Sequence, residues 1–195
     1  MVSNRGIWFA PWLLVGGCAN LVAMQPITDL STLERHLLSG IPLAREMQMR
    51  VAEYDGQCLV LIAPLAPNVN DKGCAFGGSL VSLMTLACWS LATMRLGEAG
   101  HAAEVFVQDS MVNYLEPVWG EIVVEAQQLL GDGEWGDFLG MFAARGKARI
   151  TLTACVTTEG GGVAARLSAR FVALRGESAA PQRFTRNPED TNHET

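Results

Sequence analysis

The residues most able to do chemistry in this sequence are two adjacent glycines, Gly77 and Gly78, which join a polar loop to a long apolar segment. Glycine has no side chain, so a ligand can approach the backbone N–H groups at such a place closely. If the apolar segment is a helix, its dipole also favours negative charge at this end. The pair could therefore bind a carbonyl oxygen that becomes an oxyanion. The alternative is that the glycines only permit a tight entry into the helix.

The apolar segment, residues 79–94, carries no charge until Arg95. Its 16 residues would span about 24 Å as a helix, which is short for a bilayer crossing. Five of its side chains carry hydroxyl groups, and glycines flank it. A helix that is apolar on all sides is usually enclosed by protein. We therefore predict a buried central helix and no membrane span.

The other elements predict an α+β domain. A short amphipathic helix is expected at 29–39, and two strands at 47–53 and 57–64 are joined by an Asp-Gly turn. Four more strands are expected in the second half, where glycine-rich turns separate most of them: 103–115, 121–130, 145–157 and 162–174. We interpret these four as an antiparallel meander wrapping around the helix.

The amino-acid composition argues against several classes of protein and of site. A chain of 195 residues with 49% hydrophobic and 17% charged residues forms one domain rather than a disordered chain. A net charge of −6 argues against a nucleic-acid binder. Five cysteines without a C-x-x-C pair, together with only three histidines, argue against a metal site. The odd number of thiols favours reduced cysteines and a cytoplasmic protein.

The two ends are expected to lie outside this domain, which we place at residues 24–175. Residues 1–23 form an N-terminal extension that has the shape of a lipoprotein signal ending at Cys18. The alternative is that translation begins at Met24. Residues 176–195 are polar and are expected to form a disordered tail.

Several sequence motifs, in their order along the chain, resemble those of the hotdog-fold thioesterases. Their helix entry reads N-x-x-G-x-x-H-G-G, and this frame is filled from Asn70 to Gly78 with Phe76 in place of the histidine. The closer match is the branch typified by the YiiD C-terminal domain, which also has this phenylalanine. It then has G-S-L-x-S-L and a helix tryptophan, here Trp89. Further matches, within about residues 29–175, are Asp109, Tyr114 and Pro117, and then Gly146-Lys147-Ala148-Arg149.

The resemblance implies a hotdog fold, in which a curved antiparallel sheet wraps around one long central helix. It also implies a homodimer, or a tetramer of two such dimers, with active sites at the subunit interface. Asn70 matches the asparagine that hydrogen-bonds the thioester carbonyl or the attacking water, and Gly77 matches the residue whose amide forms the oxyanion site. Phe76, Gly78 and Ser79 are expected beside them in the substrate site. No cofactor is implied, because the thioester is carried on acyl carrier protein or CoA.

Thr85 departs from the hydrolytic relatives, many of which have aspartate or glutamate at this place. A threonine hydroxyl cannot replace a carboxylate without a base of its own. Decarboxylation of a malonyl thioester needs only stabilisation of the enolate oxygen, and the YiiD branch has been assigned malonyl-acyl-carrier-protein decarboxylase activity. We therefore expect malonyl-ACP decarboxylation, which gives acetyl-ACP for fatty-acid synthesis. Acyl-thioester hydrolysis and a non-catalytic acyl-thioester binding module are the alternatives.

Charged residues outside the loop are further candidates for the substrate site. Asp109 could supply a carboxylate across a dimer, or it could anchor a strand. Residues 138–176 contain six basic residues and one acidic residue, Glu159. Arg145, Lys147 and Arg149 occupy alternate positions and would share one face of a strand. Such a patch suits the phosphates of CoA or the acidic surface of acyl carrier protein, although a solvated outer sheet face would look the same.

Overall fold

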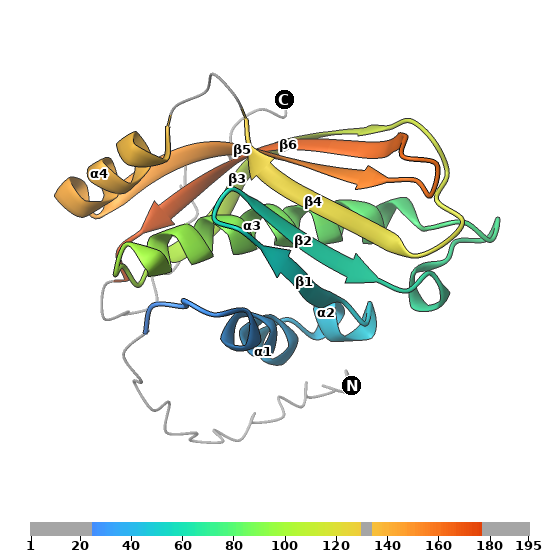
Figure 1. Cartoon of the computed structure of the whole chain (residues 1–195), viewed down its shortest axis with the longest axis horizontal. Helices are drawn as coiled ribbons and strands as arrows, with labels where there is room; N and C mark the ends of the chain where they lie inside the picture. Colours follow the sequence, from blue (N-terminus) through green and yellow to red (C-terminus); the bar gives the residue numbers. More distant parts are fainter. Residues whose placement is uncertain (1–24, 130–133, 177–195) are drawn as a thin grey trace, which may run out of the picture.

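The computed structural model describes residues 25–129 and 134–176 (Figure 1). The predicted extension at 1–23 and almost all of the predicted tail lie outside these residues. The fold is α+β, as predicted: a curved six-stranded antiparallel sheet lies along the long helix α3, Gly77–Glu98. The strands are β1 (Arg50–Tyr54), β2 (Cys58–Ala63), β3 (Glu104–Tyr114), β4 (Ile122–Gln128), β5 (Lys147–Thr157) and β6 (Val163–Leu174).

Helix α3 forms the centre of the core. By length and composition it could cross a membrane, but 67% of its most apolar window is buried inside the protein. Leu83, Met84 and Leu91 are fully buried, and the helix packs against strands from both halves of the sheet. This confirms the predicted central helix, whose apolar surface is covered by the sheet on one side and by the N-terminal helices on the other.

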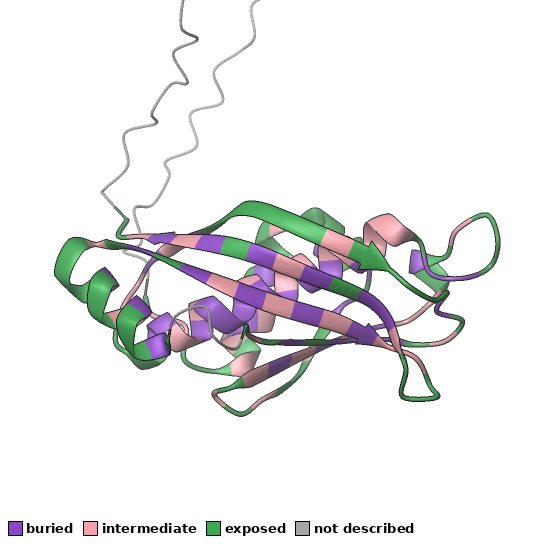
Figure 2. Cartoon of the chain, turned by 90° about the horizontal axis from the view of Figure 1, so that it is seen from above, coloured by how far each residue is buried: buried purple, intermediate pink, exposed green. Residues whose placement is uncertain are grey.

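The longest strands alternate between a buried and a solvated face. In β5 the side chains at 148, 150, 152, 154 and 156 are buried, while the intervening side chains are exposed or half-buried (Figure 2). Strand β3 differs, because consecutive side chains from Phe106 to Met111, on both faces of the strand, are exposed. This difference follows from its position, since β3 is an edge strand.

The strand order is β1-β2-β4-β5-β6-β3, so the predicted four-strand meander is wrong for β3. Strands β4, β5 and β6 do form a meander, but β3 pairs with β6 at the far edge. The physical reason lies in the link between β3 and β4. Residues 115–121 are too many for a tight hairpin and include Pro117, so the chain crosses to the other part of the sheet instead.

Helix α4, Trp135–Arg145, was not predicted. Trp135, Phe138 and Phe142 are buried at helical spacing, and Gly146 ends the helix in a left-handed conformation with φ 66°. Arg145 is therefore the last residue of a helix, and the prediction that it shares a strand face with Lys147 and Arg149 is wrong. The sequence pattern misled because two glycines at 136 and 140 interrupt the apolar run.

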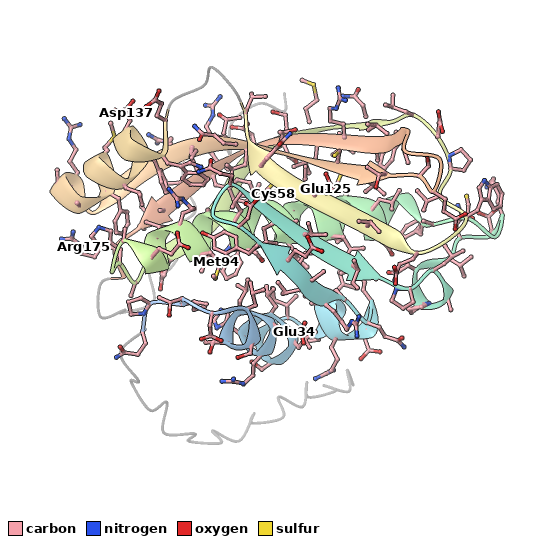
Figure 3. All side chains as sticks on the ribbon, viewed as in Figure 1. Glu34, Cys58, Met94, Glu125, Asp137 and Arg175 are labelled. Atoms are coloured by element: carbon pink, nitrogen blue, oxygen red, sulfur yellow. The ribbon has the colours of Figure 1, made fainter. Side chains whose placement is uncertain are left out.

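Two short helices cover the opposite side of α3. Helix α1, Leu30–Gly40, agrees with the predicted helix and is capped by the Asp29 carboxylate, which accepts the Thr32 N–H at 2.9 Å. Helix α2, Pro42–Glu46, follows directly. Glu34 of α1 accepts the backbone N–H of Val51 in β1 at 2.8 Å, which fixes α1 against the sheet edge (Figure 3).

Candidate active site

The loop before α3 is held in place by a buried asparagine, Asn68. Its side-chain nitrogen donates to the carbonyl oxygens of Met47 at 2.9 Å and Pro64 at 2.8 Å. Its backbone carbonyl accepts the N–H of Phe76 at 2.7 Å, directly before the helix. This role could not be predicted from the sequence, because one asparagine in a polar loop gives no signal of burial. The start of α3 is therefore fixed by contacts with three separate segments.

Asn70 stabilises the turn that follows. Its side-chain oxygen accepts the backbone N–H groups of Lys72 at 2.8 Å and Cys74 at 3.3 Å, and its side-chain nitrogen lies 3.2 Å from the Cys74 sulfur. Gly73 completes the turn with φ 85°, which a residue with a side chain rarely adopts. Asn70 is thus half-buried and held rigidly, and the role of its amide toward a substrate stays a prediction.

The first turn of α3 offers backbone N–H groups. Phe76 occupies the N-cap position and no side chain caps the helix. Among the described residues, none accepts a hydrogen bond from the amides of Gly77 and Gly78. A side chain on Gly78 would overlap the Phe76 ring, so this glycine lets the exposed ring fold back over the helix start. These two amides can serve the oxyanion role that was predicted from the sequence.

Tyr114, the last residue of β3, fixes this turn from the side. Its hydroxyl group donates to the carbonyl oxygen of Gly77 at 3.0 Å. Its ring lies beside Gly77, where an added Cβ would stand 3.4 Å from the ring carbons. The carbonyl of Gly77 and the N–H of Gly78 belong to one peptide group. Tyr114 therefore orients the Gly78 N–H, and the sequence had suggested this residue only as part of a family pattern.

An open cleft of about 320 Å³ lies beside Gly77 and Tyr114. Its walls are mainly apolar, but one acidic residue, Glu116, reaches it from the link after β3. Sequence analysis had not singled out Glu116. The remaining lining residues are Ala75, Leu80, Leu115, Pro117 and Val118.

The other predicted site residues do not line this cleft within one chain. Phe76 and Ser79 lie at the helix start outside it, and Thr85 lies half-buried two turns further along α3. Asp109 is exposed on β3, with its carboxylate 3.9 Å from Arg170 of β6. In one chain, Asp109 therefore contacts the neighbouring strand rather than the start of α3.

Lys147 and Arg149 of the predicted basic patch lie at the opposite end of the sheet from the cleft. Lys147 and Arg149 pair with Leu174 and Val172 of β6, whereas Tyr114 pairs with Ala165. The seven steps from residue 165 to residue 172 span about 24 Å of strand. Arg149 also donates to the side chain of Gln108 at 3.0 Å. Within one chain these cations are thus too far from Gly77 to contact the same small group.

Across residues 25–129 and 134–176, no group of three or more histidine, cysteine, aspartate or glutamate side chains could hold a metal ion. The four cysteines in these ranges are free thiols. Burial raises the pKa of the fully buried Cys88 thiol, and burial likewise raises those of Cys58 and Cys155. These three thiols are therefore poor nucleophiles at neutral pH.

Comparison with known proteins places these features in a family. The family model described as "Putative thioesterase (yiiD_Cterm)" matches residues 30–175. A solved structure of a protein of unknown function from Chlorobaculum tepidum is 28% identical, with a TM-score of 0.71 over 78% of this chain and 98% of that chain. A "putative thioesterase" from Shewanella oneidensis is 25% identical, with a TM-score of 0.67 over 74% and 96%. A "probable thioesterase" from Pseudomonas aeruginosa, at 22% identity and a TM-score of 0.63 over 77% and 99%, shares the fold.

Proposed function

Because the chain belongs to this YiiD C-terminal thioesterase family, we propose that it acts on short acyl thioesters of acyl carrier protein or CoA and that it decarboxylates a malonyl thioester. The observation that carries the proposal is the start of α3. Gly77, whose amide is free, lines a mainly apolar cleft, the free amide of Gly78 follows it in the chain, and the helix has no acidic residue before Glu98. Such a site stabilises an oxyanion and has no helix carboxylate to activate water or to repel a malonyl group.

In this reaction the thioester carbonyl oxygen accepts the N–H groups of Gly77 and Gly78. The bond between the malonyl carboxylate and its methylene carbon breaks, and carbon dioxide leaves. The bonding electrons enter the thioester as an enolate, whose oxygen the two amides stabilise. The enolate carbon then takes one proton from solvent and becomes an acetyl group. Asn70 would support the same carbonyl from the adjacent loop, with its one remaining amide hydrogen.

Hydrolysis is the second candidate function, and Glu116 is the observation that favours it. This carboxylate borders the same cleft as Gly77 and could activate water by removing its proton. Its carboxylate also lies near Gly162, in the turn between β5 and β6, where an added Cβ would stand 3.7 Å from it. Because the Glu116 carboxylate also faces this turn, it lies toward the rim of the cleft. Decarboxylation therefore remains the reaction that we propose first.

We propose that the working unit is a homodimer joined along β3. This strand forms a long sheet edge with exposed apolar side chains, including Phe106, Met111 and Tyr114. Antiparallel pairing of two β3 strands would bring the Glu104 end of one strand beside the Tyr114 end of the other. Lys147 and Arg149 of one chain would then lie at the end of the sheet where the partner's cleft lies, although on the outer face, and could bind the phosphate of a carrier arm there.

The test is to incubate the purified full chain with malonyl-acyl carrier protein and to record the intact mass of the carrier over time. Loss of one carbon dioxide, leaving acetyl carrier, supports decarboxylation. Release of the free carrier thiol supports hydrolysis, and Glu116→Gln should then abolish it. Binding of the carrier without a change in its mass would contradict both reactions and favour the binding module.

A further inference from the structure

A second cavity, of about 300 Å³, lies at the end of α3 that is farthest from Gly77. Thr93, one of its lining residues, is 16 residues beyond Gly77, which corresponds to about 24 Å along the helix. The cavity is therefore separate from the candidate active site. Its walls come from the segment before α1, from α1 and α3, and from the loop after α3: Gln25, Pro26, Ile27, Thr32, His36, Trp89, Thr93, Leu96, His101, Ala102 and Ala103.

The walls of this cavity are fixed by specific contacts. The indole N–H of Trp89 donates to the carbonyl oxygen of Val105 at 2.8 Å, and the His36 ring stacks parallel to the indole at 5.8 Å. Gly97 allows the backbone of Ile27 to pack directly on α3, because a side chain there would overlap the Ile27 carbonyl. Glycine inside a helix costs about 1 kcal/mol relative to alanine, so its presence suits this close approach. The cavity is thus built into the fold.

The lining has a distinct chemistry. It contains no aspartate, glutamate, lysine or arginine, although the protein is acidic overall. It contains two of the three histidines of the chain, His36 and His101, and the His101 ring is held against Phe142 at 5.2 Å. The cavity near the turn between β5 and β6 is the opposite case, because Glu116, Glu121 and Glu159 border it and would repel an anion.

We propose that the second cavity binds a monocarboxylic acid with a linear apolar chain of medium length. Pro26, Ile27 and Leu96 provide an apolar wall for the chain. The imidazole N–H groups of His36 and His101 provide donors for the carboxylate, and no acidic side chain opposes it. The volume lies at the lower end of ligand cavities, which fits a free acid better than a whole acyl thioester. This site does not depend on the reaction proposed above.

The test is isothermal titration of the full chain with octanoate, with octanol as an uncharged probe of the same length. Hydrogen bonds to a charged group predict that octanoate binds about 10- to 100-fold more tightly than octanol. The double variant His36→Ala/His101→Ala should lose the same factor for octanoate and keep its weak affinity for octanol. Ala102→Leu, which fills the cavity, should remove both, and unfolding curves would establish that each variant is folded.

Asn70→Ala is the matched control, because it changes the distant candidate active site and should leave octanoate binding unchanged. Three results would each overturn the proposal: equal affinity for octanoate and octanol, octanoate binding that survives both cavity variants, or binding that Asn70→Ala abolishes. The last result would place octanoate in the active-site cleft. Absence of any saturable heat in the unaltered protein would equally reject the site.

Discussion

Replacing Tyr114 by phenylalanine isolates one interaction at the candidate active site. The substitution removes the hydroxyl that donates to the Gly77 carbonyl at 3.0 Å and keeps the ring that packs beside Gly77. Because Tyr114 is 54% exposed, water can hydrate the Gly77 carbonyl in the variant, and no buried polar group is left unsatisfied. We therefore expect a folded protein whose Gly78 N–H is less firmly oriented.

The size of the effect follows from a single hydrogen bond between uncharged groups. Such a bond contributes about 0.5–1.5 kcal/mol, which corresponds to about a 2- to 13-fold change in rate if the whole contribution is felt in the transition state. The oxyanion forms only as the thioester reacts, so the loss should appear in kcat and leave KM nearly unchanged.

The assay is conversion of malonyl-acyl carrier protein at several substrate concentrations, with unfolding curves as a control for the fold. Tyr114→Leu, which also removes the ring, should lower kcat further because Gly77 loses its packing partner. A Tyr114→Phe variant with unchanged kcat would refute the orienting role. A variant in which only KM rises would place the hydroxyl on the substrate instead of on the helix.

Three other predictions concern separate parts of the molecule. Asn70→Ala should lower turnover in the carrier assay by about 10²–10³-fold. Asn70→Asp keeps the side-chain oxygen that holds the loop and should lose turnover as well, because the amide donor to the substrate is gone. Full activity in Asn70→Asp would show that Asn70 only stabilises the turn. Gly97→Ala should lower the free energy of unfolding in denaturant by about 1–3 kcal/mol, because the added methyl group would overlap the Ile27 carbonyl. Gly136→Ala in α4, where the added methyl group meets open space, should instead raise it by about 0.5–1 kcal/mol. Equal effects of the two substitutions would exclude the clash. Hydrogen bonds, first of all from the Ser31 hydroxyl, lower the pKa of Asp29 from 3.8 to about 2. The stability that the Asp29 carboxylate contributes is therefore complete above about pH 4 and is lost as the pH falls through 2. The difference in melting temperature between the unaltered protein and Asp29→Ala should narrow over this window, and a difference that persists at pH 2 would contradict this.

The sequence predicted elements whose local pattern was strong. The uncharged run before Arg95 indicated the central helix, and the composition of residues 147–157 and 163–174 indicated strands there. The prediction was wrong where an element is determined by an interaction between residues that are far apart in the chain. The place of β3 depends on its pairing with β6, and α4 depends on burial of three aromatic side chains against the core. The pairing of β3 leaves no local signal, and the helical spacing of the three aromatic residues in α4 is interrupted by Gly136 and Gly140.

The residues of the candidate site also include some that could be predicted from the sequence and others that could not. Gly77 and Gly78 could be selected because glycine before an apolar helix has a direct physical consequence for the backbone. Asn68 and Glu116 could not, because a buried loop asparagine and a cleft carboxylate look like ordinary polar residues until the fold places them. The contact between Tyr114 and Gly77 joins residues 37 positions apart, so no spacing rule predicts it.

The separation between the cleft and the basic residues bears on how the site is assembled. One chain places its free amides and Tyr114 at one end of β3, and Arg149 beside Gln108, nearer the other end. Of the basic residues in β5 and β6, only Arg166, which pairs with Asn113, lies near the Tyr114 end of β3 within one chain. In the dimer that we propose, antiparallel pairing of β3 with a second copy would reverse the strand and bring Lys147 and Arg149 of one copy to the end of the sheet where Tyr114 of the other copy lies. The exposed apolar edge of β3 and the distance of Lys147 and Arg149 from Gly77 are therefore the two observations that favour the proposed site made by two copies.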